Sequence, residues 1–399
     1  MAVFQLKDGT WGYRVLVKDK DGISRNRRAT RDKLGNKFKT KKDATKAMNE
    51  VIRKFETPVI VKEKDSDVTV REVFEEYCKY GRGDKAFGTI RKQDSLWNIH
   101  IEKDFGDRCI RDITVAEVND YLNDLYYGEG YSYTFVESFL KFFYLIFGQA
   151  HSRDYLSSEK YNKLCVDKNV RIHMPKLKID EDLDIKAFDM HQMDLLDEYF
   201  KGTTMETAYM LGKHCGLRRG ECFGLTWDCV DFKNGYIKIE KQLQDQNGVL
   251  KIVPLKTRCA RRQIVMSDKL KEYLEKVYKQ REQDRVDNKD LWEQKKIIIK
   301  DSCGNEYLSH NFVNTLRTGK LVTDSALKFH GINIRNKLGI EFKYHYLRHT
   351  FGTNMALQNI PQYLLCNQMG HSNINVTSKY YLAETKDGYD ILKKHLNLL

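Results

Sequence analysis

The sequence predicts an α+β protein of several domains. A small three-stranded β-sheet with one helix comes first, then an all-helical domain, then a mainly helical domain with a small antiparallel β-sheet. Three observations support this prediction: apolar residues alternate near the N-terminus, helical spacing dominates residues 68–160, and an Asn-Gly hairpin turn interrupts the later helices. A length of 399 residues suits two or three domains.

The N-terminal unit, residues 1–57, begins with short alternating stretches. Tyr13, Val15 and Val17 fall on one face of a strand, and residues 41–56 then carry apolar side chains at helical spacing. Sixteen Lys and Arg against seven Asp and Glu give this unit +9 of the net charge of +13. Such an excess on a small folded unit favours contact with a polyanion.

A short β-sheet with basic side chains can enter a DNA groove, so the strands of this unit supply candidates for DNA contact. These candidates are Arg14, Arg25, Arg27, Arg28 and Lys37. In the helical domain, Lys79, Arg91 and Lys92 are candidates for a DNA-facing side, although helix surfaces often carry such residues.

Charged or aperiodic segments separate the three domains. Residues 58–67 predict one linker, and residues 166–185, with one proline and mixed charge, predict a second. The helical domain between them, residues 68–165, opens with a capping box at Thr69 and repeats it at Thr114. The third domain, residues 186–399, contains a hairpin with Asn247-Gly248 in its turn.

Composition excludes several classes of protein. No segment approaches the length of an apolar membrane span and the N-terminus has no signal-peptide pattern, so we expect a cytoplasmic protein without a membrane partner. The nine cysteines form no C-x-x-C pair, which indicates reduced thiols. Cys215, Cys222 and Cys229 recur every seven residues, but no second cluster completes a zinc site, so we expect no metal.

The stretch "HYLRHTFGTNM", residues 345–355, places His345 and His349 one helical turn apart, with Arg348 next to the second. A zinc-protease helix reads H-E-x-x-H, and Tyr346 stands where its glutamate base would be. A metallohydrolase is therefore a poor interpretation. A histidine beside an arginine suits an anion, above all a phosphate.

Three further signals lie in the C-terminal half. Arg218 and Glu221 belong to "GLRRGE" at the start of a helix, Lys256 is expected on a strand next to the hairpin, and His371 precedes Tyr380 by nine residues. Each signal alone is more often structural than catalytic. Their order along the chain, Arg, Lys, His-x-x-Arg, His and Tyr, is much more specific.

This ordered set resembles the tyrosine recombinase, or phage integrase, family, and the resemblance covers the whole chain. It is similar in its domain layout to integrases of conjugative transposons and temperate phages. The resemblance implies an arm-type DNA-binding domain at residues 1–57, a core-binding domain at 68–165 and a catalytic domain at 186–399. It implies the catalytic set Arg218, Lys256, His345, Arg348, His371 and Tyr380, with Glu221 bracing Arg218.

The chemistry of such a site explains these residue types. Two guanidiniums bind the phosphate oxygens and stay charged, a phenol attacks phosphorus, and the product is a 3′-phosphotyrosine. Tyr380 is the expected nucleophile, because its spacing from His371 selects it over Tyr381. His345 is the candidate acceptor of its proton. Lys256 suits protonation of the leaving 5′-oxygen, and His349 is expected to pack behind Arg348. The covalent bond keeps the energy for rejoining, so no cofactor, ATP or metal is expected.

The implied function is site-specific recombination for integration and excision of a mobile element. The implied partners are double-stranded DNA at core and arm sites and a homotetramer on DNA, with an excisionase and a host DNA-bending protein as further partners. A type IB topoisomerase-like enzyme would share the site, whereas a DNA-binding regulator would have no use for Tyr380.

The segment after Tyr380 carries an apolar stripe at helical spacing. Its members are Ile391, Leu392, His395, Leu396 and Leu399. The resemblance implies an exchange tail that docks on a neighbouring protomer. The pattern alone fits packing on the chain's own catalytic domain equally well.

Overall fold

The computed structural model of the protein describes residues 2–6, 8–18, 24–32, 35–55, 67–178 and 186–382, together with residues 393 and 396. The chain divides into two compact units, Met1–Ile179 and Asp180–Leu399. The predicted α+β class, with mainly helical parts and small sheets, is confirmed. Among the described residues, no helix is long and apolar enough to cross a membrane.

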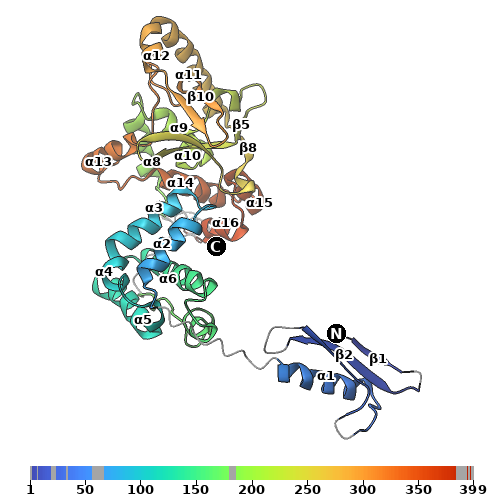
Figure 1. Cartoon of the computed structure of the whole chain (residues 1–399). Coiled ribbons are helices and arrows are strands. Elements are labelled where there is room, and N and C mark those ends of the chain that lie inside the picture. The colour runs from blue at the N-terminus through green and yellow to red at the C-terminus, as the bar shows by residue number, and fades with distance from the viewer. Residues whose placement is uncertain are drawn as a thin grey trace. The chain divides into compact units, whose positions relative to one another are not determined.

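The first unit begins with a three-stranded antiparallel sheet backed by one helix (Figure 1). Its elements are β1 (Ala2–Gln5), β2 (Trp11–Lys18), β3 (Ser24–Ala29) and α1 (Lys41–Phe55). The predicted alternation in β2 is confirmed, because Tyr13, Val15 and Val17 are buried in one core with Ala44 and Met48 of α1. No helix among the described residues packs on the other face of the sheet, and Leu16 is 62% exposed there.

Helices make up the rest of the first unit. They are α2 (Val70–Tyr80), α3 (Phe87–Leu96), α4 (Glu102–Phe105), α5 (Val115–Asn123), α6 (Tyr133–Ser152) and α7 (Ser158–Tyr161). Both predicted capping boxes are present, at Thr69 with Glu72 and at Thr114 with Glu117. The long apolar run is the buried centre of this bundle, since Phe139, Phe143 and Phe147 of α6 are almost fully enclosed.

The segment after α7 differs from the prediction. Residues 166–178, expected as linker, pack on the helical bundle. Ile172 is fully buried there, and its carbonyl oxygen accepts a hydrogen bond of 2.6 Å from the Tyr144 hydroxyl. The backbone N–H of Lys178 donates to the Tyr126 hydroxyl at 2.9 Å. Ile172, Met174 and hydrogen bonds from backbone atoms to tyrosine hydroxyls hold the segment, and none of these features produces a periodic pattern. The first predicted linker, 58–67, lies outside the described residues except for Asp67.

The second unit contains nine described helices, most of them short. They are α8 (Met190–Phe200), α9 (Glu206–Cys215), α10 (Arg219–Phe223), α11 (Asp268–Asp287), α12 (Lys289–Lys295), α13 (Ala326–Leu338), α14 (Tyr344–Leu357), α15 (Gln362–Met369) and α16 (Ile374–Leu382). The predicted exchange tail follows α16 and, apart from Lys393 and Leu396, lies outside the described residues.

Two small sheets accompany these helices. The strands are β4 (Val230–Asp231), β5 (Tyr236–Ile239), β6 (Lys241–Gln246), β7 (Val249–Pro254), β8 (Arg262–Val265), β9 (Ile298–Asp301) and β10 (Glu306–Leu308). One sheet has the order β4-β5-β8 and the other β10-β9-β7-β6. The predicted hairpin is β6–β7, and its turn residues Asn247 and Gly248 both have positive φ. The pair β7–β9 is parallel, because the chain returns through α11 and α12 before β9 forms.

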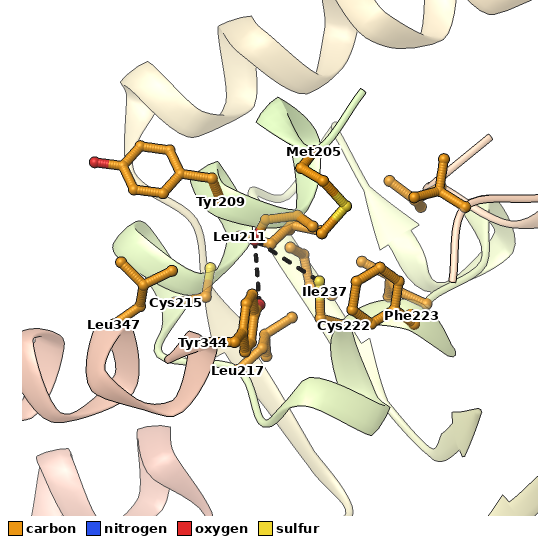
Figure 2. Packing of buried hydrophobic residues seen from close by; sticks show 14 of the residues in the cluster. Met205, Tyr209, Leu211, Cys215, Leu217, Cys222, Phe223, Ile237, Tyr344 and Leu347 are labelled. Carbon is orange, nitrogen blue, oxygen red and sulfur yellow. Dashed lines mark hydrogen bonds between the residues drawn. The ribbon is translucent and has the colours of Figure 1, made fainter. Parts of the chain in front are cut away.

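The core of this unit fixes α9, α10 and α14 against one another (Figure 2). The Tyr344 hydroxyl of α14 donates to the carbonyl oxygen of Ala208 in α9 at 3.1 Å, and the Cys222 thiol of α10 reaches the same oxygen at 3.8 Å. Burial raises the pKa of the Cys215 and Cys222 thiols to about 12, so both are protonated packing groups. This packing fixes the positions of Arg218, at the start of α10, and of Arg348, within α14.

The contact of α10 with β6 allows no side chain at Gly224. A Cβ there would lie 2.6 Å from the backbone nitrogen of Leu243, and backbone cannot move aside cheaply. We predict that Gly224→Ala lowers the stability of the second unit by about 1–3 kcal/mol, the usual range for overpacking. Thermal unfolding followed by circular dichroism measures the shift. Gly148→Ala in α6 is the matched control, because open space surrounds Gly148. Equal transition temperatures for Gly224→Ala and wild type would contradict the steric argument.

Candidate active site

Three arginines from three elements meet at the C-terminal end of α15. Arg262, Arg348 and Arg218 donate hydrogen bonds to the carbonyl oxygens of residues 368, 369 and 370, at 2.8, 2.5 and 3.1 Å respectively. The last carbonyls of a helix have no partner within the helix and carry partial negative charge. The three guanidiniums therefore cap α15 and fix the turn that leads to His371.

Glu221 lies beneath two of these arginines and is 2% exposed. Arg262 donates to both of its carboxylate oxygens, at 3.1 and 2.9 Å, and Arg218 donates to one of them at 2.9 Å. Burial raises the pKa of Glu221, but the hydrogen bonds and charge of Arg262, together with Arg218, outweigh it and leave the pKa below its ordinary value. A carboxylate thus holds Arg218 in place, as the sequence predicts.

Arg348 is almost completely buried, at 1% exposed. Besides its bond to residue 369, it donates to the Gly216 carbonyl oxygen at 2.7 Å and to His371 Nε2 at 2.8 Å. Burial lowers its pKa to about 9, with a further contribution from Arg218, so the guanidinium stays charged at neutral pH.

His371 is held in one tautomer by its two partners. Arginine has no acceptor atom, so Nε2 must accept from Arg348, and Nδ1 must carry the proton that it donates to the Thr377 hydroxyl at 2.8 Å. Burial and the neighbouring arginines lower the pKa of His371 to about 3, which keeps the ring neutral. The ring stacks on Tyr380, with centroids 6.0 Å apart.

The two adjacent tyrosines have different surroundings. Tyr380 is 4% exposed, and its hydroxyl lies 3.2 Å from His349 Nδ1. Burial raises its pKa, while Arg348 and Arg218 act in the opposite direction. Tyr381 is 36% exposed, and its hydroxyl donates to the Ile360 carbonyl oxygen instead. Only the first of the two hydroxyls points into the arginine cluster.

The two histidines of α14 differ from the expectation. His349, expected to pack behind Arg348, turns its ring toward Tyr380 and stands edge-on to His345, with centroids 4.5 Å apart. His345 remains exposed at the surface, although the surrounding protein, Arg348 and Arg218 lower its pKa. Both side chains share a helix face, so the packing of α16 on α14 decides which of them meets the phenol.

Lys256 lies apart from this cluster. It was expected on a strand, but it occupies the exposed loop between β7 and the short turn Arg258–Ala260. Within the described part of the chain, no hydrogen bond or ion pair joins it to the arginines or to Tyr380. Among the residues described, no group of three or more His, Cys, Asp or Glu side chains could hold a metal ion.

The predicted DNA-binding residues of the first unit fall into two sets. Arg14 and Arg28 are register partners on the uncovered face of the sheet, where the Arg28 guanidinium lies 5.1 Å from the centre of the Phe4 ring. Arg27 and Arg25 pair with Val15 and Val17, so their positions belong to the face that α1 covers. Lys37 forms an ion pair of 2.6 Å with Asp8.

The three candidates of the helical bundle do not form one cluster of contacts. Arg91 is exposed on α3, and Lys92 donates to the Ser138 hydroxyl of α6 at 2.5 Å. Lys79 of α2 lies 5.0 Å from the centre of the Tyr80 ring.

Sequence reasoning missed Arg262 as a member of the site. The sequence does indicate this role, because Arg262 lies two residues before the buried Ile264 on β8. The two side chains therefore share the apolar face of the strand. An arginine on such a face needs a buried acceptor. Thr377, which fixes the tautomer of His371, has no comparable signal in the sequence.

The pairing of Arg262 with Glu221 makes stability depend on pH. We predict that Arg262→Met destabilises the second unit by about 3–5 kcal/mol at pH 7, because a buried charge loses its main partner. The folded-state pKa of Glu221 is depressed, so the pair contributes stability above the unfolded pKa of 4.5 and loses it as pH falls through the folded value. The difference between variant and wild type should therefore shrink on acidification.

Denaturant unfolding at a series of pH values measures this difference, and Glu221→Gln with Arg262→Met closes the double-mutant cycle. A difference that stays constant down to about pH 4 would show that the ion pair is not its cause.

Comparison with known proteins agrees with this fold. The family model described as "Phage integrase family" matches residues 188–387, half of the chain, and "Phage integrase, N-terminal SAM-like domain" matches residues 69–126. A "Tyrosine recombinase XerC-like" protein of Caldanaerobacter subterraneus subsp. tengcongensis is 24% identical over 283 residues, covering 67% of each chain. The "Transposase from transposon Tn916" of Enterococcus faecalis is 30% identical over 188 residues, covering 46% of this chain and 43% of that protein.

Among solved structures, the fold is similar to the Tn1549 transposon integrase in complex with a circular intermediate DNA. The TM-score is 0.62 at 20% identity, over 82% of this chain and 99% of that one. A family model that spans half of the chain, and a similar fold over most of it, lead to one conclusion: the chain belongs to the phage integrase family of tyrosine recombinases.

Proposed function

We propose that this protein is a site-specific DNA recombinase that cuts and rejoins strands through a 3′-phosphotyrosine on Tyr380. One observation carries the proposal: Tyr380 is buried, its ring stacks on His371 and its hydroxyl lies 3.2 Å from His349 Nδ1, whereas the Tyr381 hydroxyl bonds to a backbone carbonyl elsewhere. A phenol in the company of fixed cations is suited to attack a phosphodiester, whose transition state gains negative charge.

Arg218 and Arg348 would bind the non-bridging oxygens of the scissile phosphate. A guanidinium presents several donors in a rigid plane, and the pKa of about 9 keeps that of Arg348 charged at neutral pH. Glu221 and Arg262 would keep Arg218 aligned through the hydrogen bonds described above. Because Arg348 donates to His371 Nε2, a phosphate oxygen that takes over this N–H would free Nε2, and His371 would donate to the phosphate once Nε2 carries a proton.

The reaction needs a proton acceptor for Tyr380 and a proton donor for the leaving 5′-oxygen. Lys256, as an exposed ammonium in a loop, would reach the leaving oxygen once DNA is bound. His345 is the proton acceptor proposed from the sequence. His349, however, is the histidine whose Nδ1 lies 3.2 Å from the Tyr380 hydroxyl. The phosphotyrosine bond would conserve the energy of the phosphodiester, so rejoining would need no nucleotide or metal.

The natural substrate of the reaction would be the DNA of a mobile element, at core and arm sites. The names of similar proteins support this, since they include a transposase of Tn916 and an integrase of Tn1549 bound to a circular intermediate DNA. Assembly as a homotetramer on DNA, exchange of the C-terminal tail, an excisionase and a host DNA-bending protein are further parts of the proposal, and they rest on the family resemblance.

Arm sites would be bound by residues 1–57. The uncovered face of the β-sheet supports this role, because it carries Arg14 and Arg28 beside the exposed Leu16. Basic side chains next to an apolar one on a narrow sheet suit the phosphates and base edges of a groove.

The nucleophile is tested with a nicked suicide DNA substrate that traps covalent protein–DNA complexes. We predict that Tyr380→Phe binds DNA normally and forms no covalent complex, while Tyr381→Phe keeps substantial activity and loses only one hydrogen bond to a backbone carbonyl. Denaturing gel electrophoresis separates the adduct from free DNA. Adduct formation by Tyr380→Phe, together with an inactive Tyr381→Phe, would reverse the assignment of the two residues.

The role of the N-terminal sheet is tested by salt dependence. We predict that the double variant Arg14→Ala with Arg28→Ala binds DNA duplexes from the ends of the mobile element more weakly than the wild-type full-length protein. The slope of log K against log salt concentration should fall in magnitude by about 2, one for each phosphate that an arginine no longer neutralises. Lys42→Ala with Lys46→Ala removes the same charge from the exposed side of α1 and is the matched control. Fluorescence anisotropy at about 50–200 mM salt gives both slopes. Equal slopes for the two double variants would contradict the proposed DNA-facing side.

A further inference from the structure

The hydroxyl of Tyr380 has one histidine partner, and it is not the histidine that the family pattern indicates. His349 Nδ1 lies 3.2 Å from the Tyr380 oxygen, which is hydrogen-bond distance. Within the described residues, no contact joins His345 to this oxygen, and the His345 ring stands edge-on against His349 instead. His349 therefore lies between the Tyr380 hydroxyl and His345.

The protonation state of His349 suits an acceptor. Its ring faces His345, Tyr346 and Arg348 of its own helix and Tyr380 of α16. Burial lowers the pKa of His349 to about 4, and His345 and Arg348 add to this shift. Near pH 7 the ring is therefore neutral. The phenol can donate to Nδ1, provided that the ring carries its own proton on Nε2.

The position of Tyr380 against α14 is tightly constrained. Gly352, one turn after Arg348, lies so close that a Cβ there would be 3.0 Å from the Tyr380 ring. His371 stacks on the phenol ring as well, with an angle of 14° between the planes. These contacts hold the hydroxyl beside His349.

We propose that His349 is a further catalytic residue, which holds the Tyr380 hydroxyl and takes its proton during strand cleavage. The inference rests on the proposed function. In the step, Tyr380 Oη forms a bond to phosphorus, the bond from phosphorus to the 5′-oxygen breaks, and the proton of Oη moves to His349 Nδ1. The leaving oxygen receives a proton from Lys256. In rejoining, the oxygen of the 5′-hydroxyl forms a bond to phosphorus and the bond from phosphorus to Tyr380 Oη breaks. The hydroxyl proton returns to Lys256, and His349 returns its proton to Oη.

His345 has a different place in this scheme. It is exposed and braces the outer edge of His349, so it remains available to contact the phosphate. Substitution of His349 and substitution of His345 should therefore change the pH dependence of cleavage differently, and the test compares the two.

The test is single-turnover cleavage by the full-length protein as a function of pH. The substrate is a suicide duplex with sulfur in place of the bridging 5′-oxygen, because a thiolate leaves without a proton and only deprotonation of the nucleophile then limits the rate. The variants are His349→Asn, His349→Leu and His345→Asn. His330→Asn is the matched control, since His330 Nδ1 contacts the Tyr199 hydroxyl at 3.0 Å, away from this cluster.

The expected result follows from the state of each group. A base acts when it is deprotonated, so wild type should be flat between about pH 6 and 8.5, above the pKa of His349. Both His349 variants should lose about 100-fold in rate at pH 7 and then gain tenfold per pH unit, because hydroxide must replace the base. The asparagine retains a hydrogen-bond acceptor near Nδ1 but takes no proton. His345→Asn and His330→Asn should keep the flat profile.

Several outcomes would overturn the inference. A wild-type rate in His349→Asn would mean that the residue only holds the hydroxyl. A sloped profile in His345→Asn with a flat one in His349→Asn would make His345 the acceptor. A sloped profile in His330→Asn would trace the effect to general disruption of packing. A wild-type protein that forms no adduct at all, like Tyr380→Phe, would instead refute the proposed function itself.

Discussion

The geometry of the candidate site depends on the capping of α15 by three guanidiniums. Arg218, Arg262 and Arg348 come from segments far apart in the sequence, and each bonds to a successive carbonyl oxygen at residues 368–370. The turn that follows leads to His371 and then to the helix of Tyr380. Fixing three orphan carbonyls therefore fixes the arginines proposed to bind phosphate relative to Tyr380, the proposed nucleophile, because the same bonds connect both.

Charge balance explains the protonation states around this cap. Three buried or half-buried arginines face one buried carboxylate, Glu221, so the pocket has an excess of positive charge. Burial, together with this excess, lowers the pKa of His345, His349 and His371 alike. Neutral imidazoles can accept protons and hydrogen bonds at pH 7. The excess positive charge favours an anion, and in the proposed reaction a phosphodiester would supply it.

Much of this could be predicted from the sequence, where local rules decide. The capping box at Thr69 and the Asn247-Gly248 turn depend on short-range patterns. The set of site residues from Arg218 to Tyr380 is instead assigned through the family resemblance. Tertiary packing decides the rest. His345 and His349 share a helix face, so periodicity cannot tell which meets Tyr380. Residues 166–178 show no period, yet they pack on the bundle through Ile172 and backbone hydrogen bonds.

The contact between Arg348 and His371 has a consequence for selectivity. His371 Nε2 already accepts from one N–H of the buried guanidinium, so a phosphate oxygen that takes this particular N–H would not fill a vacancy. The phosphate oxygen would replace His371 as the hydrogen-bond acceptor. The net free energy gained is then only the difference between the two hydrogen-bonded states. Free inorganic anions gain little from such an exchange. A phosphate within a duplex arrives with the contacts of the whole DNA surface, and that additional free energy can drive the exchange.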